Sequence, residues 1–216
     1  MEALSEFMKI DLKEFDLHKA GKIRNILKQD GVIIYPTETI YGLGSNCFSH
    51  KAIRRIFDIK SRSKSKALAV VISDLDMLKK IVREGRLPSY FEKLSQNFWP
   101  GPLTLILNAA SHLPADLLGP GGTIAVRQPG LDWLRSLIAF CGFPLISTSS
   151  NLSGKKSILN AKQAFEVFQG KVDLVIDGGK VPGILPSTIV DLTLPDPKIV
   201  RKGIIPPKKI IPYLKK

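Results

Sequence analysis

Polar side chains that directly follow apolar segments give the first sign of chemistry in this sequence. Residues 31–44 read GVIIYPTETIYGLG, and the apolar run ends at Pro36, which cannot donate to an interior strand ladder. Three polar residues come next: Thr37, Glu38 and Thr39. Hydroxyl groups beyond the carboxyl end of a buried strand can bind a small polar substrate, and Gly42 and Gly44 predict a flexible turn. Taken alone, the segment is equally consistent with a loop whose threonines only satisfy backbone groups.

A basic segment, residues 60–66 with the sequence KSRSKSK, stands directly before another apolar run. Arginine contacts phosphate with two parallel hydrogen bonds and lysine acts as a point charge, so this segment could hold a triphosphate. The alternative is a solvated loop, which is the usual state of a charged run. Its position after a basic helix face favours phosphate or RNA.

A third segment, residues 145–154, reads LISTSSNLSG and is rich in hydroxyl groups. It lacks the glycines of a nucleophile elbow and of a phosphate-binding P-loop, and no histidine is placed to activate a serine. A hydroxyl-rich nucleotide-binding loop is the better interpretation. Isolated polar groups also mark the ends of other apolar runs: Arg127, Ser187, Thr188 and Arg201.

The composition indicates a folded protein that attracts polyanions. The chain has 216 residues and a formal net charge of +13, so nucleotides, tRNA or other RNA are natural partners. The N-terminus lacks the apolar core of a signal peptide, and no segment suits a bilayer, so we expect a cytoplasmic protein without membrane contact. Cys47 and Cys141 are expected to be buried thiols, and the spacing of Cys and His predicts no metal site.

Short β-branched runs alternate with amphipathic segments, which predicts an α/β fold. The predicted strands, expected to be interior, are Val32–Tyr35, Ala67–Ile72, Leu103–Leu107, Thr123–Arg127, Leu145–Thr148, Val172–Ile176, Thr188–Leu192 and Ile199–Arg201. The predicted helices are Ser49–Lys60, Asp74–Arg83, Ser89–Asn97, Leu131–Cys141 and Asn160–Gln169. We expect one domain over residues 13–203 and a basic C-terminal tail over residues 204–216.

Across residues 13–203 the sequence resembles the YrdC-like threonylcarbamoyl-AMP synthases in their single-domain form. The resemblance is carried by blocks in matching order and spacing: YPTETIYGLG, KSRSKSKAL, FWPGPLTLIL, TIAVRQP, SSNLSG, STIVDL and IVRKG. It implies a twisted, largely mixed sheet flanked by helices around a concave basic cavity. It also implies that L-threonine, bicarbonate and ATP are converted to threonylcarbamoyl-AMP and pyrophosphate, for the threonylcarbamoyladenosine modification of tRNA by downstream transferase proteins.

The resemblance also assigns roles to residues. Lys60, Arg62 and Lys66 would bind the ATP phosphates as the catalytic cations, and four residues would complete the nucleotide pocket: Thr123, Ser149, Asn151 and Arg201. Thr39 would contact threonine, Arg127 would hold its carboxylate or the carbamate, and Ser187 and Thr188 would close the threonine side. Mg²⁺ would accompany the triphosphate, although no carboxylate cluster marks a metal site.

The sequence departs from the family pattern at Ser63 and Ala67, where prolines are common, and at Val71, where some members have histidine. These departures bear on the rigidity of the basic segment and on the threonine contacts. The main alternative is a non-catalytic RNA-binding or ribosome-maturation module, favoured by the charge and the basic tail. A carbamoyl transferase acting on proteins is a third reading, against which the absence of companion zinc-finger or acylphosphatase-like segments argues.

Overall fold

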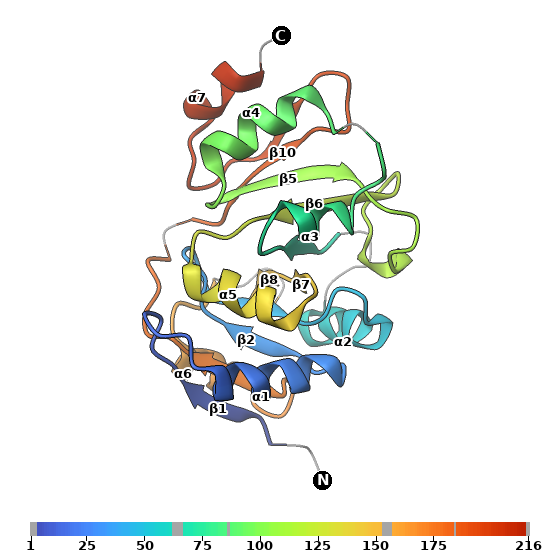
Figure 1. Ribbon diagram of the computed structural model, residues 1–216. Coiled ribbons are helices and arrows are strands. Elements are labelled where there is room, and N and C mark those ends of the chain that lie inside the picture. The colour runs from blue at the N-terminus through green and yellow to red at the C-terminus, as the bar shows by residue number, and fades with distance from the viewer. Residues whose placement is uncertain (1–3, 62–66, 86, 153–156, 184, 215–216) are drawn as a thin grey trace.

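The computed structural model describes residues 4–61, 67–85, 87–152, 157–183 and 185–214. It confirms the α/β class, and the strands form two mixed sheets that lie one above the other, with the chain termini at opposite ends of the molecule (Figure 1). Every predicted strand is present to within about two residues at its ends, apart from the Leu145–Thr148 run, which the structure splits between the sheets.

The first sheet has the strand order β1-β9-β2-β3-β8. Its strands are β1 (Glu6–Lys9), β9 (Leu174–Asp177), β2 (Ile33–Tyr35), β3 (Gly42–Gly44) and β8 (Thr148–Ser149). The β1, β9 and β2 strands run parallel, whereas β3 is antiparallel to both β2 and β8. The predicted flexible turn at Gly42 and Gly44 is therefore wrong, since both glycines belong to a buried strand.

The second sheet has the order β11-β10-β5-β6-β4-β7. Its strands are β11 (Lys198–Arg201), β10 (Thr188–Asp191), β5 (Leu103–Asn108), β6 (Thr123–Arg127), β4 (Ala69–Val71) and β7 (Leu145–Ile146). Parallel and antiparallel neighbours alternate across it. The expectation of interior strands fails for β11, which forms the sheet edge and is largely exposed.

Helices surround the two sheets. The structure has α1 (Leu17–Lys28), α2 (His50–Lys60), α3 (Leu75–Lys79), α4 (Ser89–Phe98), α5 (Asp132–Cys141), α6 (Ala161–Phe168) and α7 (Pro207–Ile210), and the short 3₁₀ turns η1 (Ala115–Leu117) and η2 (Ile211–Leu214). In α2 the Ser49 side chain accepts from the Ala52 backbone N–H, and in α6 Asn160 accepts from Gln163 N–H, so both predicted N-caps are confirmed.

The α1 helix and the β1 strand are among the elements that were not predicted, and one helix is shorter than predicted. The α1 helix has a signal in the sequence, because Asp16 caps it and Ala20, Ile23 and Leu27 recur on its buried face. The β1 strand is short and mostly exposed, so its sequence carries little pattern. The helix predicted over Asp74–Arg83 ends at Lys79.

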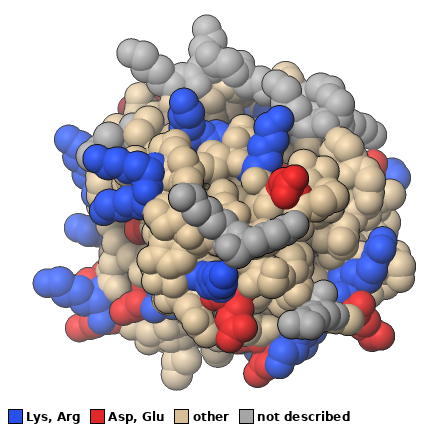
Figure 2. Space-filling view, turned by 90° about the horizontal axis from the view of Figure 1, so that it is seen from above, with Lys and Arg blue, Asp and Glu red and all other residues tan. Residues whose placement is uncertain are grey.

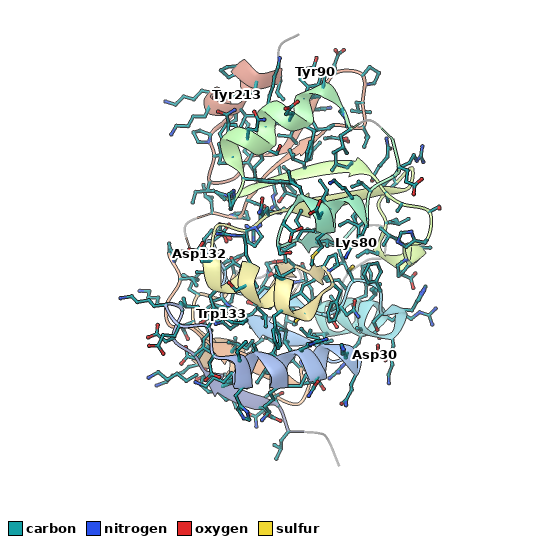
Figure 3. The ribbon with its side chains drawn as sticks, viewed as in Figure 1. Asp30, Lys80, Tyr90, Asp132, Trp133 and Tyr213 are labelled. Atoms are coloured by element: carbon teal, nitrogen blue, oxygen red, sulfur yellow. The ribbon has the colours of Figure 1, made fainter. Side chains whose placement is uncertain are left out.

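The segment predicted as a basic tail is folded against the body of the protein. Residue Ile210 of α7 is fully buried, and the Tyr213 ring meets Phe98 of α4 edge-on at 5.3 Å between centroids. The Tyr213 hydroxyl also lies 3.1 Å from the side-chain oxygen of Asn97, and Figure 3 shows this tyrosine beside α4. None of the described helices has the length and apolar character needed to cross a membrane.

The two sheets are joined by the strand pair β7 and β8, between which the chain passes from one sheet to the other at Ser147. The Ile146 backbone N–H donates to Ser45 O at 2.8 Å, and Ser147 N–H donates to Ala69 O at 2.7 Å. At Gly44 a Cβ would stand 1.9 Å from the Ile146 carbonyl oxygen. Glycine is needed there because the two backbones approach too closely for any side chain.

Candidate active site

A cavity of about 240 Å³ opens between the two sheets and takes residues from both. It is lined by Thr37, Thr39, Ile40, Gly42, Ala67, Ala69, Val71, Thr104, Ala125, Arg127, Ser147, Thr148, Ser149, Ser157, Pro186, Ser187, Ile189 and Arg201. Side chains that can hydrogen-bond therefore alternate with small apolar ones. Such a lining suits a polar ligand of modest size.

The floor of the cavity is one face of the second sheet. Successive side chains of a strand point to opposite faces, so Ala69 and Val71 of β4 share a face, as do Ala125 and Arg127 of β6. Ala69 pairs with Ala125 in the register, and these two methyl groups leave open space above the sheet. The small residues thus make the room that the polar residues surround.

The loop after β2 forms one wall and holds two hydroxyl groups in fixed positions. The Thr37 hydroxyl donates to Ile40 O at 2.7 Å, accepts from the backbone N–H groups of Thr39 and Ile40, and lies 2.9 Å from the Thr39 hydroxyl. Both side chains are buried and line the cavity. Thr37 satisfies backbone groups as the second interpretation expects, and substrate binding by the hydroxyl groups stays a prediction.

Arg127 brings a buried positive charge to the cavity. Its side chain is 7% exposed, and its Nη1 atom lies 3.3 Å from Oε1 of Glu38. Tyr35 lies close to both charges; burial raises its pKa to about 12, and its hydroxyl donates to Ile146 O at 3.0 Å. The inward-facing arginine predicted at the end of this strand is therefore at the cavity, accompanied by a carboxylate.

At the other side of the floor, Arg201, Ser187 and Thr104 form a connected network. The Arg201 guanidinium donates to Ser187 O at 2.8 and 3.0 Å and to Ser187 Oγ at 2.9 Å. Ser187 Oγ lies 2.7 Å from Thr104 Oγ1. Arg201 and Ser187 therefore both line the cavity, as expected from their places at the ends of apolar runs. Thr104, which was not predicted, lines the cavity beside them.

Lys60 supports the cavity wall without lining the cavity. Its side chain ends a basic helix yet is only 2% exposed, and the ammonium donates to the backbone oxygens of Ser149 and Asn151, the latter at 2.7 Å. Asn151 Oδ1 in turn accepts from the Ser149 hydroxyl. The structure therefore places Lys60 and Asn151 as residues that hold the loop carrying Ser149, which itself lines the cavity.

Two predicted site residues lie beside the cavity. Thr188 is fully buried, and its hydroxyl donates to Ile205 O at 2.7 Å while accepting from the Gly203 and Ile205 backbone N–H groups. The Thr123 hydroxyl donates to Pro120 O at 3.1 Å. Neither residue is among those that line the cavity.

Three residues singled out from the basic segment, Arg62, Ser63 and Lys66, lie outside the described residues. Ala67 and Val71, the other departures from the family pattern, both line the cavity. Within the described part of the chain, no three His, Cys, Asp or Glu side chains come close enough to hold a metal ion. Cys47 and Cys141 are buried thiols, and burial raises the pKa of Cys141 to about 12.

Ser147 and Thr104 line the cavity and Glu38 pairs with Arg127, three features that were not predicted from the sequence. Ser147 belongs to the hydroxyl-rich segment already noted, so its type was a usable signal. Thr104 sits in an apolar strand, and only the sheet register brings it beside Ser187. Seen from above, Lys and Arg side chains are spread over the surface among acidic ones, whereas Arg127 at the cavity is buried (Figure 2).

Comparisons with known proteins show which family the sequence and the fold match. Residues 25–203 match the family named for Sua5, YciO and YrdC, which is described as "Telomere recombination". The threonylcarbamoyl-AMP synthase of Pyrococcus abyssi is 36% identical over 184 residues, which cover 85% of this chain and 54% of that protein. The chain thus spans about half the length of this curated relative.

Solved structures are similar over nearly the whole chain. The structure of P. abyssi Sua5 complexed with L-threonine has a TM-score of 0.91 and 32% identity, and the match covers 97% of this chain and 61% of that one. Escherichia coli YciO has a TM-score of 0.84 and 29% identity, with 93% of this chain and 96% of that one covered.

Proposed function

Since the chain belongs to the Sua5/YciO/YrdC family, we propose that it is an enzyme that condenses L-threonine, bicarbonate and ATP to threonylcarbamoyl-AMP and pyrophosphate. The observation that carries the proposal is the buried Arg127 beside the hydroxyl wall of a cavity shared by both sheets. A small anion can be bound there out of water.

Threonine would occupy the end of the cavity at Arg127. A guanidinium offers two parallel N–H donors, which match the carboxylate of an amino acid or the carbamate derived from it. The Thr39 hydroxyl stands in the same wall and can bond the amino-acid substrate. The P. abyssi relative was solved in complex with L-threonine, which supports threonine as a substrate.

ATP would occupy the side of the cavity at Ser149, and Arg201, which lies across the floor of the cavity and donates to Ser187, would reach it from there. Lys60 and Asn151 would act through the loop that they hold, and Thr123 and Thr188 would support the cavity from its border. Arg62 and Lys66 would bind the phosphates, as the family resemblance implies. A rigid wall matters because transfer to phosphorus depends on placing the attacking and leaving oxygens in line.

The chemistry needs a shielded site and no side-chain nucleophile. The threonine nitrogen bonds to the carbon of bicarbonate with loss of water, and an oxygen of the resulting carbamate attacks the α-phosphorus of ATP while pyrophosphate leaves. A carbamate is short-lived in water, so the two steps must follow each other in one cavity. Buried cations and N–H donors stabilise the developing charge.

Further partners complete the proposal. Mg²⁺ would enter as the counter-ion of ATP, because no described cluster of carboxylates could hold it as a resident ion. The product would pass to a transferase that modifies tRNA in the cytoplasm. The net charge of +13 favours contact with tRNA or double-stranded RNA on the outer surface.

Pyrophosphate release from ATP tests the proposal. We expect release only when L-threonine and bicarbonate are both present, with omission of either as the control. No release under any condition, together with tight RNA binding, would overturn the proposal in favour of an RNA-binding module.

A further inference from the structure

The carboxylate of Glu38 pairs with Arg127 but, among the residues that the structure describes, lacks the hydrogen bonds that a buried carboxylate normally has. The Glu38 side chain is 21% exposed, but both of its carboxylate oxygens are shielded from solvent and neither makes a hydrogen bond within the described residues. The carboxylate contacts Arg127 Nη1 at 3.3 Å as a charge alone. A buried carboxylate that lacks hydrogen bonds is costly, so a purely stabilising role explains it poorly.

The Glu38 side chain lies beside the backbone of two neighbouring loops. A Cβ placed on Gly130 would lie 3.4 Å from Glu38 Cγ and 3.6 Å from the Gly101 Cα. The Gly101 N–H donates to Gln128 O at 2.8 Å, which ties these two loops together. Arg127 lines the cavity and Glu38 does not, so a ligand in the cavity would meet the guanidinium and not the carboxylate.

This arrangement changes what Arg127 can bind. A carboxylate at 3.3 Å cancels much of the positive field of the guanidinium, and the low dielectric of the interior strengthens that cancellation. The guanidinium still carries five N–H donors, more than one contact with Glu38 can engage. A monoanionic carboxylate can use those donors, whereas a polyphosphate gains chiefly from net positive charge.

We propose that Glu38 is a specificity-determining residue, which keeps polyphosphate away from the Arg127 end of the cavity and so reserves that end for the amino-acid carboxylate. This inference rests on the proposed function, in which a carboxylate and a triphosphate must share one cavity. Arginine binds both groups well, so neutralising one arginine directs the more highly charged substrate elsewhere.

Calorimetric titration with L-threonine and inorganic tripolyphosphate tests the inference. In the unmodified protein, tripolyphosphate should leave the threonine Kd within about twofold. In Glu38→Gln, which keeps the shape and removes the charge, saturating tripolyphosphate should raise the apparent threonine Kd at least about tenfold, the effect of one charge-assisted contact. If saturating tripolyphosphate left the threonine Kd of Glu38→Gln unchanged, the inference would be overturned.

Matched variants show whether an effect comes from the charge of Glu38 or from the net charge of the protein. Glu38→Asp keeps the charge and should behave as the unmodified protein, and Glu14→Gln, which removes an exposed acid, controls for net charge. If Glu38→Gln does not give a cooperative melting transition, Glu38→Ala takes its place.

The outcome is distinguishable from failure of the proposed function. If the unmodified protein binds no threonine, the affinity for tripolyphosphate alone tests the role of Glu38. It should rise about tenfold in Glu38→Gln and return to the original value in Glu38→Gln/Arg127→Met. No rise, or a rise that persists without Arg127, would refute the assigned role of Glu38.

Discussion

Replacing Lys60 by methionine should destabilise the protein as a whole. The Lys60 ammonium is buried and donates to the backbone oxygens of Ser149 and Asn151. Hydrogen bonds from a charged donor contribute about 1.5–3 kcal/mol each, and removing the donor leaves carbonyl groups unsatisfied. Methionine fills a similar volume and removes the cost of burying a charge, which offsets part of the loss. We expect a net decrease of about 2–4 kcal/mol in the free energy of unfolding.

Thermal unfolding followed by circular dichroism measures this decrease. A chain of this size should lose about 2–4 °C in melting temperature per kcal/mol, so the midpoint should fall by roughly 5–15 °C. Lys51→Met is the matched control, because Lys51 belongs to the same helix and is exposed. Its stability should remain within about 0.5 kcal/mol of the original.

The opposite result would refute the reasoning. A lysine whose main task is to contact phosphate should be replaceable by methionine with unchanged or increased stability and with loss of ATP binding alone. If Lys60→Met behaved in that way, the phosphate role implied by the family resemblance would stand, and the loop-holding role would be wrong.

Three further substitutions test other parts of the account. Gly44→Ala should lower the free energy of unfolding by more than about 3 kcal/mol, because the new methyl group would meet the Ile146 carbonyl at 1.9 Å. Gly21→Ala, in open space on α1, should leave that free energy unchanged or raise it, and thermal melts of both variants measure the difference. Tyr35→Phe should cost about 1–2 kcal/mol through its lost hydrogen bond. Burial raises the pKa of Tyr35 to about 12, so the stabilising contribution of Tyr35 is complete below about pH 10 and is lost as the pH rises towards 12. In alkaline titrations the free energy of unfolding of Tyr35→Phe should therefore decline less steeply over that interval than that of the unmodified protein. An equally steep decline would contradict this. Arg127→Lys keeps the charge but loses the paired donors, so the KM for threonine should rise about tenfold while the KM for ATP stays nearly constant; equal rises would argue against separate ends of the cavity.

The sequence predicted the elements that depend on local pattern. The α2 helix has its cap at Ser49 and its apolar face at helical spacing, and both are present in the structure. Gly44 was misread because glycine at a close approach of two backbones looks in sequence like glycine in a turn, and Gly42 was misread because it packs against the Tyr35 ring. Only the position of Ile146, a hundred residues away in the chain, separates the two cases.

The site was predictable by residue type more than by role. Thr39, Arg127 and Ser149 reach the cavity as expected, because each follows or ends an apolar strand. Lys60 at the end of α2 and Thr188 at the start of β10 are also polar residues at the ends of elements, yet both donate to backbone carbonyl groups. Whether a polar side chain faces a ligand or the backbone depends on the register between sheets, which local sequence does not encode.

Incorporation of labelled bicarbonate into a nucleotide tests the central claim most directly. The purified protein, incubated with ATP, Mg²⁺, L-threonine and labelled bicarbonate, should form an adenylate that carries the bicarbonate carbon, and leaving out threonine should abolish it. Pyrophosphate release without label in the nucleotide, or label incorporated without threonine, would contradict the account.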